Sequence, residues 1–302
     1  MINTQIEQSR TISFSFLSFL VDLMQLTKIR LSFSIIFSSI AGYFLGAESI
    51  EFYTLFLLSI GGYAMAGASS IFNQLIEREK DGLMIRTKNR PLPSNRMSNL
   101  SAIILGIIFS LIGILFLYSI NFKTAFFSVV SILIYTCLYT PLKTVTPLSV
   151  FVGAFPGAIP FMLGWVAATG EFGIEPGILF MIQFFWQFPH FWAIGWMMDE
   201  DYQKAGFKML PSGKRDNASA FQIVFYTLWT IIISLIPVTS YSGSLILSIP
   251  AASLILILGF FFLFFSLKLM QKKDIVSAKR LMGFSIIYIT FLQIIYVVDK
   301  FI

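Results

Sequence analysis

The chain has 302 residues, of which 57% are hydrophobic and only 12% are charged, and its mean hydropathy is +0.82. Soluble proteins carry about twice that charged fraction, so the composition excludes a soluble domain and indicates an integral membrane protein. The net charge of +6 does not indicate a nucleic-acid partner, because the basic residues lie in loops between apolar segments and set membrane orientation. A single cysteine and a single histidine exclude an internal disulfide and a multi-histidine metal centre.

Apolar segments of about twenty residues predict where the chain crosses a lipid bilayer. Residues 1–30 read as an amphipathic lead-in without the features of a removable signal peptide. The rest predicts an all-α integral membrane protein, one domain over residues 1–302, with nine transmembrane helices at 31–47, 53–76, 99–118, 124–142, 147–168, 175–198, 220–240, 244–267 and 281–298.

The basic residues divide unequally between the two ends of these helices. Of the 21 lysines and arginines, only Lys123 and Lys300 lie at one end, and the other 19 lie at the N-terminus or in loops 77–98, 143–146, 199–219 and 268–280. Because cytoplasmic loops are enriched in Lys and Arg, the split places the N-terminus and those loops in the cytoplasm. The C-terminus is then predicted on the opposite side of the membrane.

An acidic register follows the second predicted span. Asn73, Glu77 and Asp81 are spaced i, i+4, i+8, so they share one face of a helix, whereas Glu79 points to roughly the opposite face. Oxygen ligands spaced in this way suit Mg²⁺, which proteins hold through one or two carboxylates plus substrate phosphates. The register therefore predicts a magnesium site at the cytoplasmic end of the span, and the alternative is an ordinary charged loop.

Basic side chains follow this register within one short segment. Arg86, Lys88 and Arg90 come directly after it, and two prolines end any helix there. Guanidinium groups suit phosphate oxygens, and Lys143, at the cytoplasmic end of the fourth span, is a further candidate phosphate contact. Acids, metal and bases together predict a site for a diphosphate. The fifth span predicts a closely packed or kinked helix, because it is rich in glycine and proline at Gly153, Pro156, Gly157, Pro160 and Gly164.

The sixth span carries the second set of candidates. Three acids, 199–201, follow it at the same membrane face, where they either help to hold metal ions around a diphosphate or only offset positive charge. Within the span lies the single histidine, His190, with Gln187 close by. Ionisable groups at membrane depth usually face the bundle interior or a cavity, so His190 is a candidate for a substrate contact or for a structural hydrogen bond.

Three segments together resemble the UbiA superfamily of intramembrane prenyltransferases, and within it the heme O synthases (protoheme IX farnesyltransferases). The first is similar to the pattern Asn-x-x-x-Asp/Glu-x-x-x-Asp with Met-x-Arg-Thr-x-x-Arg-Pro, at Asn73, Glu77, Asp81, Met84, Arg86, Thr87, Arg90 and Pro91. The others are similar to Tyr-Thr-x-x-Lys and to Trp-Gln-x-Pro-His-Phe with Asp-Tyr-x-x-Ala-Gly-x-x-Met-Leu-Pro, at Tyr139, Thr140, Lys143, Trp186, Gln187, Pro189, His190, Phe191, Asp201, Tyr202, Ala205, Gly206, Met209, Leu210 and Pro211. Glu77 stands where the family more often has aspartate, and Ala205 stands where quinone-directed relatives have a second aspartate.

The resemblance implies a UbiA-type bundle in a bacterial inner membrane and the transfer of a farnesyl group from farnesyl diphosphate to a vinyl carbon of heme B, giving heme O with Mg²⁺ as cofactor. It implies catalytic roles for Asn73, Glu77, Asp81 and Asp201, of which Glu77, Asp81 and Asp201 are metal ligands. It also implies heme contacts at His190 and Gln187. The implied diphosphate contacts are Lys28, Arg30, Arg86, Arg90 and Lys143. Heme A synthase or terminal oxidase assembly is the implied protein partner.

Two alternative functions stay open on the sequence. A UbiA-type prenyltransferase acting on another aromatic acceptor, a quinone or chlorophyll precursor, needs the same diphosphate chemistry. A transporter also has charged helix ends and Gly/Pro-broken helices, but it pairs its charges near the bilayer midplane. Here the acids cluster at one face, which favours the enzyme.

Overall fold

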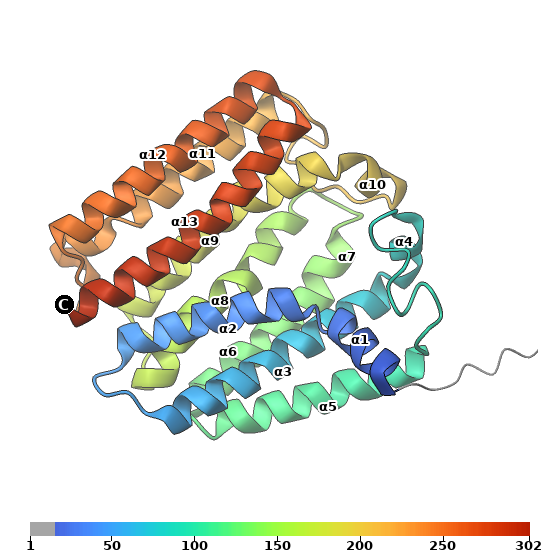
Figure 1. Ribbon diagram of the computed structural model, residues 1–302, viewed down its shortest axis with the longest axis horizontal. Coiled ribbons are helices and arrows are strands. Elements are labelled where there is room, and N and C mark those ends of the chain that lie inside the picture. The colour runs from blue at the N-terminus through green and yellow to red at the C-terminus, as the bar shows by residue number, and fades with distance from the viewer. Residues whose placement is uncertain (1–15) are drawn as a thin grey trace, which may run out of the picture.

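The computed structural model describes residues 16–302, and this part of the chain forms a bundle of helices (Figure 1). The α-helices are α1 (Phe16–Leu26), α2 (Ile29–Gly46), α3 (Phe52–Ile76), α4 (Arg78–Leu83), α5 (Asn99–Tyr118), α6 (Phe122–Leu133), α7 (Thr140–Leu142), α8 (Ser149–Thr169), α9 (Ile174–Met197), α10 (Asp199–Lys204), α11 (Asn217–Ile233), α12 (Ile249–Lys272) and α13 (Ile275–Phe301). A π-helical segment, Ile134–Tyr139, joins α6 to α7, and two short 3₁₀ turns, Ile236–Val238 and Ser240–Ser242, follow α11. Of the predicted lead-in 1–30, residues 1–15 lie outside the described residues, and the remainder forms α1 and the start of α2.

Eight segments of residues 16–302 are long and apolar enough to cross a membrane: α2, α3, α5, 122–142, α8, 217–238, α12 and α13. The remaining predicted span, the sixth at 175–198, corresponds to α9, whose 24 residues include Gln183, Gln187 and His190. These polar residues lower its hydropathy. The helix packs against α8, α11 and α13 inside the bundle, where polar groups at membrane depth find partners. The predicted all-α membrane fold is confirmed.

The turn between α12 and α13 is much shorter than the predicted loop 268–280. Helix α12 continues to Lys272, and Lys273 turns the chain with left-handed φ and ψ of 53° and 28°. Asp274 then caps α13 by accepting a hydrogen bond from Ser277 N at 2.6 Å. The predicted boundaries 244–267 and 281–298 were therefore wrong by several residues, because the charges mark where each helix leaves the apolar region and not where it ends.

Helix α8 lies at the centre of the bundle and touches α2 through glycines. A Cβ at Gly164 would lie 1.8 Å from the Ser39 carbonyl oxygen of α2, and one at Gly42 would lie 2.0 Å from the Phe161 carbonyl oxygen of α8. Only hydrogen atoms fit between the two backbones there, which is how small residues let membrane helices pack closely. This contact fixes α2, and with it the α1–α2 junction, against the helix that also supports the site.

Candidate active site

Three polar side chains share a buried face where α3 gives way to α4. Helix α3 ends beside Glu77, but the bonds from Glu77 N to Asn73 O (3.0 Å) and from Asp81 N to Glu77 O (2.8 Å) keep the helical register through the junction. Asn73, Glu77 and Asp81 are therefore aligned, and none of the three is more than 4% exposed. Glu79 is exposed on the other side, as the spacing predicts.

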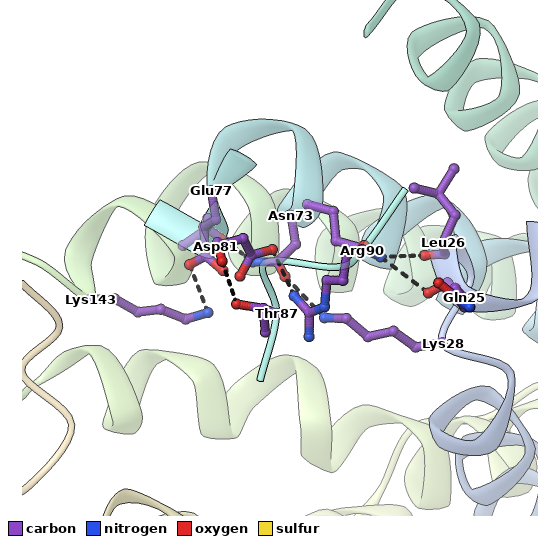
Figure 2. Close-up of polar contacts among 11 residues, drawn as sticks. Gln25, Leu26, Lys28, Asn73, Glu77, Asp81, Thr87, Arg90 and Lys143 are labelled. Atoms are coloured by element: carbon purple, nitrogen blue, oxygen red, sulfur yellow. Dashed lines mark hydrogen bonds and ion pairs between the residues drawn. The ribbon is translucent and has the colours of Figure 1, made fainter. Parts of the chain in front are cut away.

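Each carboxylate of this face pairs with a basic side chain from another part of the chain (Figure 2). Glu77 Oε1 lies 2.8 Å from Lys143 Nζ, just after α7, and Asp81 Oδ2 lies 2.7 Å from Arg90 Nη1, in the loop 84–98. Burial alone lowers the pKa of Lys143, but the adjacent Glu77 carboxylate outweighs it and raises that pKa above its ordinary value. Glu77, Lys143 and Asp81 are buried in these pairs, whereas the Arg90 side chain is 21% exposed.

Lys28 enters the same site from the junction of α1 and α2. Its backbone is left-handed (φ 48°, ψ 54°), which is uncommon for a residue with a side chain and is often found at functional sites. Gln74 Nε2 fastens the junction to α3 by donating to the Leu26 carbonyl at 2.7 Å. Lys28 Nζ donates to Asn73 Oδ1 at 3.0 Å, and Asn73 Nδ2 donates to Thr140 Oγ1 at 3.0 Å. Burial, together with neighbouring basic groups, lowers the pKa of Lys28 to about 7.

Two aromatic rings also lie close to the Lys143 ammonium group. The Nζ of Lys143 lies 4.4 Å from the centre of the Tyr139 ring and 5.6 Å from that of Phe207, both within cation–π range. Tyr139 ends the π-helical segment, a distortion often found at functional sites, and packs on Gly153 of α8, where a Cβ would lie 2.7 Å from the ring. The glycine of α8 thus makes room for the ring that holds the lysine.

One cavity joins these groups. Its walls are formed by Lys28, Asn73, Glu77, Asp81, Met84, Arg86, Arg90, Tyr139, Lys143, Tyr202, Phe207 and Met209. Four of the five predicted diphosphate contacts therefore meet in one place. The fifth, Arg30, is exposed on the first turn of α2 and does not line the cavity.

Asp201 lies beside the cavity and does not form part of its wall. Its Oδ2 accepts a hydrogen bond from the backbone N of Arg86 at 3.4 Å, and its Oδ1 lies 3.3 Å from Lys204 Nζ. Within residues 16–302 no group of three or more carboxylate, histidine or cysteine side chains is placed to hold a metal ion. In this arrangement the second acidic segment touches the loop 84–98 through Asp201 but does not join Glu77 and Asp81.

The oxygens on the buried face suit a hard cation. Mg²⁺ is commonly bound by one or two carboxylates, with water and substrate phosphates completing its octahedron. Glu77 and Asp81 supply two carboxylates on one helix face, each ion pair uses only one oxygen of its carboxylate, and the amide of Asn73 lies next to them. The basic residues around them supply the counter-charge that a diphosphate needs.

The two predicted heme contacts, both on α9, bond to different neighbouring helices and lie outside the wall of this cavity. His190 Nδ1 lies 2.7 Å from Ser285 Oγ on α13. Gln187 faces α8, where its Nε2 donates to the Ala154 carbonyl at 2.9 Å and its amide fills the space left by Gly157. A Cβ at Gly157 would lie 2.0 Å from Gln187 Oε1, so this glycine is what admits the amide.

Several residues of the site were not among the predicted site residues. Tyr139, Thr140 and Tyr202 belong to the motifs quoted above, so the sequence contained a signal for them. Thr87, also in a motif, donates from Oγ1 to the Asp81 carbonyl at 2.7 Å and steadies the start of the loop 84–98. Phe207 occupies a position that none of the patterns specifies, and only the fold brings it to the cavity.

Comparison with known proteins identifies the family. The model of the UbiA prenyltransferase family matches residues 35–292. The chain belongs to the UbiA prenyltransferase family. Among its relatives, the protoheme IX farnesyltransferase of Christiangramia forsetii is 59% identical over 94% of this chain and 95% of that protein. The protoheme IX farnesyltransferase of Flavobacterium johnsoniae is 55% identical over 94% of this chain and 96% of that protein. The resemblance predicted from the motifs is confirmed.

Solved structures of other proteins have the same fold. A structure of digeranylgeranylglyceryl phosphate synthase superimposes with a TM-score of 0.76, at 19% identity over 93% of this chain and 98% of that one. A UbiA homologue from Archaeoglobus fulgidus, bound to GPP and Mg²⁺, superimposes with a TM-score of 0.68, at 15% identity over 91% of this chain and 99% of that one. At these identities the likeness concerns the fold alone.

Proposed function

We propose that this protein transfers the farnesyl group of farnesyl diphosphate to a vinyl group of heme B and so makes heme O. The observation that carries the proposal is the 55–59% identity, over almost the whole chain, to relatives named protoheme IX farnesyltransferase. The cavity supports it independently, because buried carboxylates beside Lys28, Arg90 and Lys143 are the groups that a magnesium diphosphate needs.

The cavity residues divide the work of the first step. Glu77 and Asp81 would hold Mg²⁺, while Lys143, Arg90 and Lys28 would contact the diphosphate oxygens. Mg²⁺, when bound, supplies positive charge that stabilises the negative charge growing on the leaving group. The basic side chains act in the same direction, and being fixed in a buried site they need no rearrangement as the charge develops. A phosphate beside Lys28 also favours the charged form of its ammonium group.

The bonds change in a simple order. The C1–O bond of farnesyl diphosphate breaks, and its electron pair leaves with pyrophosphate. The terminal carbon of the heme vinyl group forms the new bond to C1, and the neighbouring carbon takes up water and releases a proton. Tyr139, Tyr202 and Phe207 line the cavity where the allylic cation forms, and aromatic faces stabilise cations.

The orientation and the protein partner belong to this proposal too. The excess of basic residues at the site end of the bundle supports a cytoplasmic diphosphate site and a C-terminus on the other side of the membrane. A heme product also fits association with heme A synthase or with the assembly of a terminal oxidase, and that association stays a prediction. Asp201, Arg30 and Gln187 stay predictions as site residues.

An acceptor assay tests the function. The protein in lipid nanodiscs is incubated with farnesyl diphosphate, Mg²⁺ and either heme B or 4-hydroxybenzoate, and the products are resolved by mass. We expect heme O from the first mixture and no prenylated product from the second. A prenylated quinone precursor without heme O would replace this proposal with the alternative acceptor class.

A further inference from the structure

The hydrogen bonds around His190 define which of its ring nitrogens carries the proton. Ser285 Oγ donates its one proton to the Met282 carbonyl at 2.6 Å. The contact of 2.7 Å between Ser285 Oγ and His190 Nδ1 then requires the nitrogen to donate. Nδ1 therefore carries the proton of the neutral ring, and the lone pair lies on Nε2. Nε2 makes no hydrogen bond to any part of residues 16–302.

The imidazole ring is held in one orientation. Trp186 stacks on it, with 4.7 Å between ring centres and 18° between ring planes. The indole Nε1 of Trp186 donates to the Ser285 carbonyl at 2.6 Å. Ser285 of α13 thus fixes both the imidazole ring of His190 and the indole ring of Trp186. Metal-binding histidines have this arrangement, in which the second nitrogen donates to a partner that fixes the ring.

The face of α9 that carries His190 packs against α13. Gln183 lies on this face two turns earlier, and it accepts a hydrogen bond from Gln293 of α13 at 3.0 Å. Gln293 also donates to Ser38 of α2 at 3.1 Å, so these polar groups close the meeting point of the three helices. His190 lies two helical turns after Gln183, toward the diphosphate cavity, and is partly exposed. Ile286, next to Ser285 on α13, is 47% exposed. At this level of α9 the protein therefore does not fully enclose His190, and a flat ligand needs such an opening to approach the ring.

We propose that Nε2 of His190 is an axial ligand of the iron of heme B, and that Ser285 is the positioning residue that holds the ligating tautomer. This inference rests on the proposed function and names how the acceptor is held. Helix α9 ends at Met197, about 10 Å of rise beyond His190, and the cavity-lining Tyr202 follows on α10. An iron fixed at His190 therefore leaves the porphyrin rim, which carries the vinyl groups, free to extend toward the cavity.

Comparing the binding of heme B with that of metal-free protoporphyrin IX distinguishes an iron–histidine bond from packing of the porphyrin against the protein. Wild type, His190→Ala and Ser285→Ala in nanodiscs are titrated with heme B, followed by the Soret band, and with protoporphyrin IX, followed by fluorescence. We expect His190→Ala to remove the histidine-ligated heme spectrum, with recovery on adding imidazole, and to weaken heme binding at least tenfold. We expect Ser285→Ala to weaken it by about tenfold, as loss of a partner behind a metal ligand does. Protoporphyrin IX binding stays within about twofold in both, because no iron is involved.

Ser266→Ala is the matched control, because Ser266 Oγ donates to the Leu263 carbonyl at 2.8 Å just as Ser285 bonds its own helix, and no hydrogen bond joins it to His190. This variant should bind both porphyrins like wild type. A histidine-ligated spectrum that persists in His190→Ala, or an equal loss of both porphyrins, overturns the inference. Heme O formation by the wild type in the same preparation tests the proposed function separately, so the two can fail independently.

Discussion

Two acids on α4 differ in their surroundings, and this difference predicts a large loss of activity on mutating Asp81 and a small one on mutating Glu79. Asp81 is 1% exposed and pairs with Arg90, whereas Glu79 is exposed on the other face. Asp81→Asn keeps the size of the side chain but removes the charge that a metal ligand supplies. We expect it to lower heme O formation by about 100-fold, a usual loss for a group that stabilises transition-state charge.

Glu79→Gln is the control for this substitution, because it removes an acid of the same short helix. We expect its rate to stay within about twofold of wild type, as for most surface substitutions. Heme O formed per amount of protein, in membranes with matched expression, measures both. Equal losses in the two variants would show that charge density and not the buried face matters, and the assignment of Asp81 as a ligand would fail.

Mutating the ion pair between Glu77 and Lys143 distinguishes its contribution to stability from its contribution to catalysis. Both residues are buried, with exposures of 4% and 8%, so removing one leaves an unpaired charge in the bundle. We expect Lys143→Gln to lower both the melting temperature and the activity, with a loss of about 3 kcal/mol in stability. The double variant Glu77→Gln/Lys143→Gln should recover much of the melting temperature but not the activity. Activity that returns together with the melting temperature would mean that the pair is only structural.

At the scale of secondary-structure elements, Arg96 ties α1 to the loop that carries Arg86 and Arg90. Its Nε donates to Asp22 Oδ1 at 2.9 Å and its Nη2 donates to Gln25 Oε1 at 3.0 Å, both on α1. Its Nη1 also donates to the Asn89 carbonyl within the loop at 2.9 Å. The loop 84–98 is therefore anchored to the helix that leads into Lys28.

Removing the hydrogen bonds of Arg96 to α1 should weaken the binding of farnesyl diphosphate but not the binding of heme B. We expect Arg96→Ala to raise the KM for farnesyl diphosphate by about tenfold, since small displacements of positioned groups are costly, and to leave the KM for heme B unchanged. Lys88→Ala, an exposed residue of the same loop, should change neither constant. The exchange Asp22→Arg/Arg96→Asp should recover part of the loss. An equal rise in both KM values would point to general unfolding instead.

At the scale of the whole molecule, the orientation can be read with single cysteines. Cys137 is exposed, so the background carries Cys137→Ser. A membrane-impermeant thiol reagent added outside intact cells should label Glu48→Cys and miss Lys88→Cys, both of which are exposed positions. The excess of basic residues at the site end is the reason. Labelling of position 88 without position 48 would reverse the topology.

The sequence predicted the bundle well because span length is set by bilayer thickness, and a run of about twenty apolar residues records it directly. It predicted the face formed by Asn73, Glu77 and Asp81 because that face depends only on helical spacing. The partners of these residues depend on contacts between distant segments, such as α7 carrying Lys143 to Glu77. No local pattern encodes those contacts. For the same reason the spacing did not reveal that Asp201 contacts the backbone of Arg86 instead of joining the carboxylates, or that Phe207 lines the cavity.

Removal and return of Mg²⁺ tests most directly whether the buried carboxylates and the basic residues act together on a diphosphate. Wild-type and Asp81→Asn membranes are treated with EDTA, supplied with heme B and farnesyl diphosphate, and sampled by mass spectrometry before and after Mg²⁺ is added back. The proposed chemistry predicts no heme O before the addition, heme O from the wild type after it, and little from Asp81→Asn. Undiminished heme O formation without any divalent cation, or equal formation by the two proteins, would contradict it.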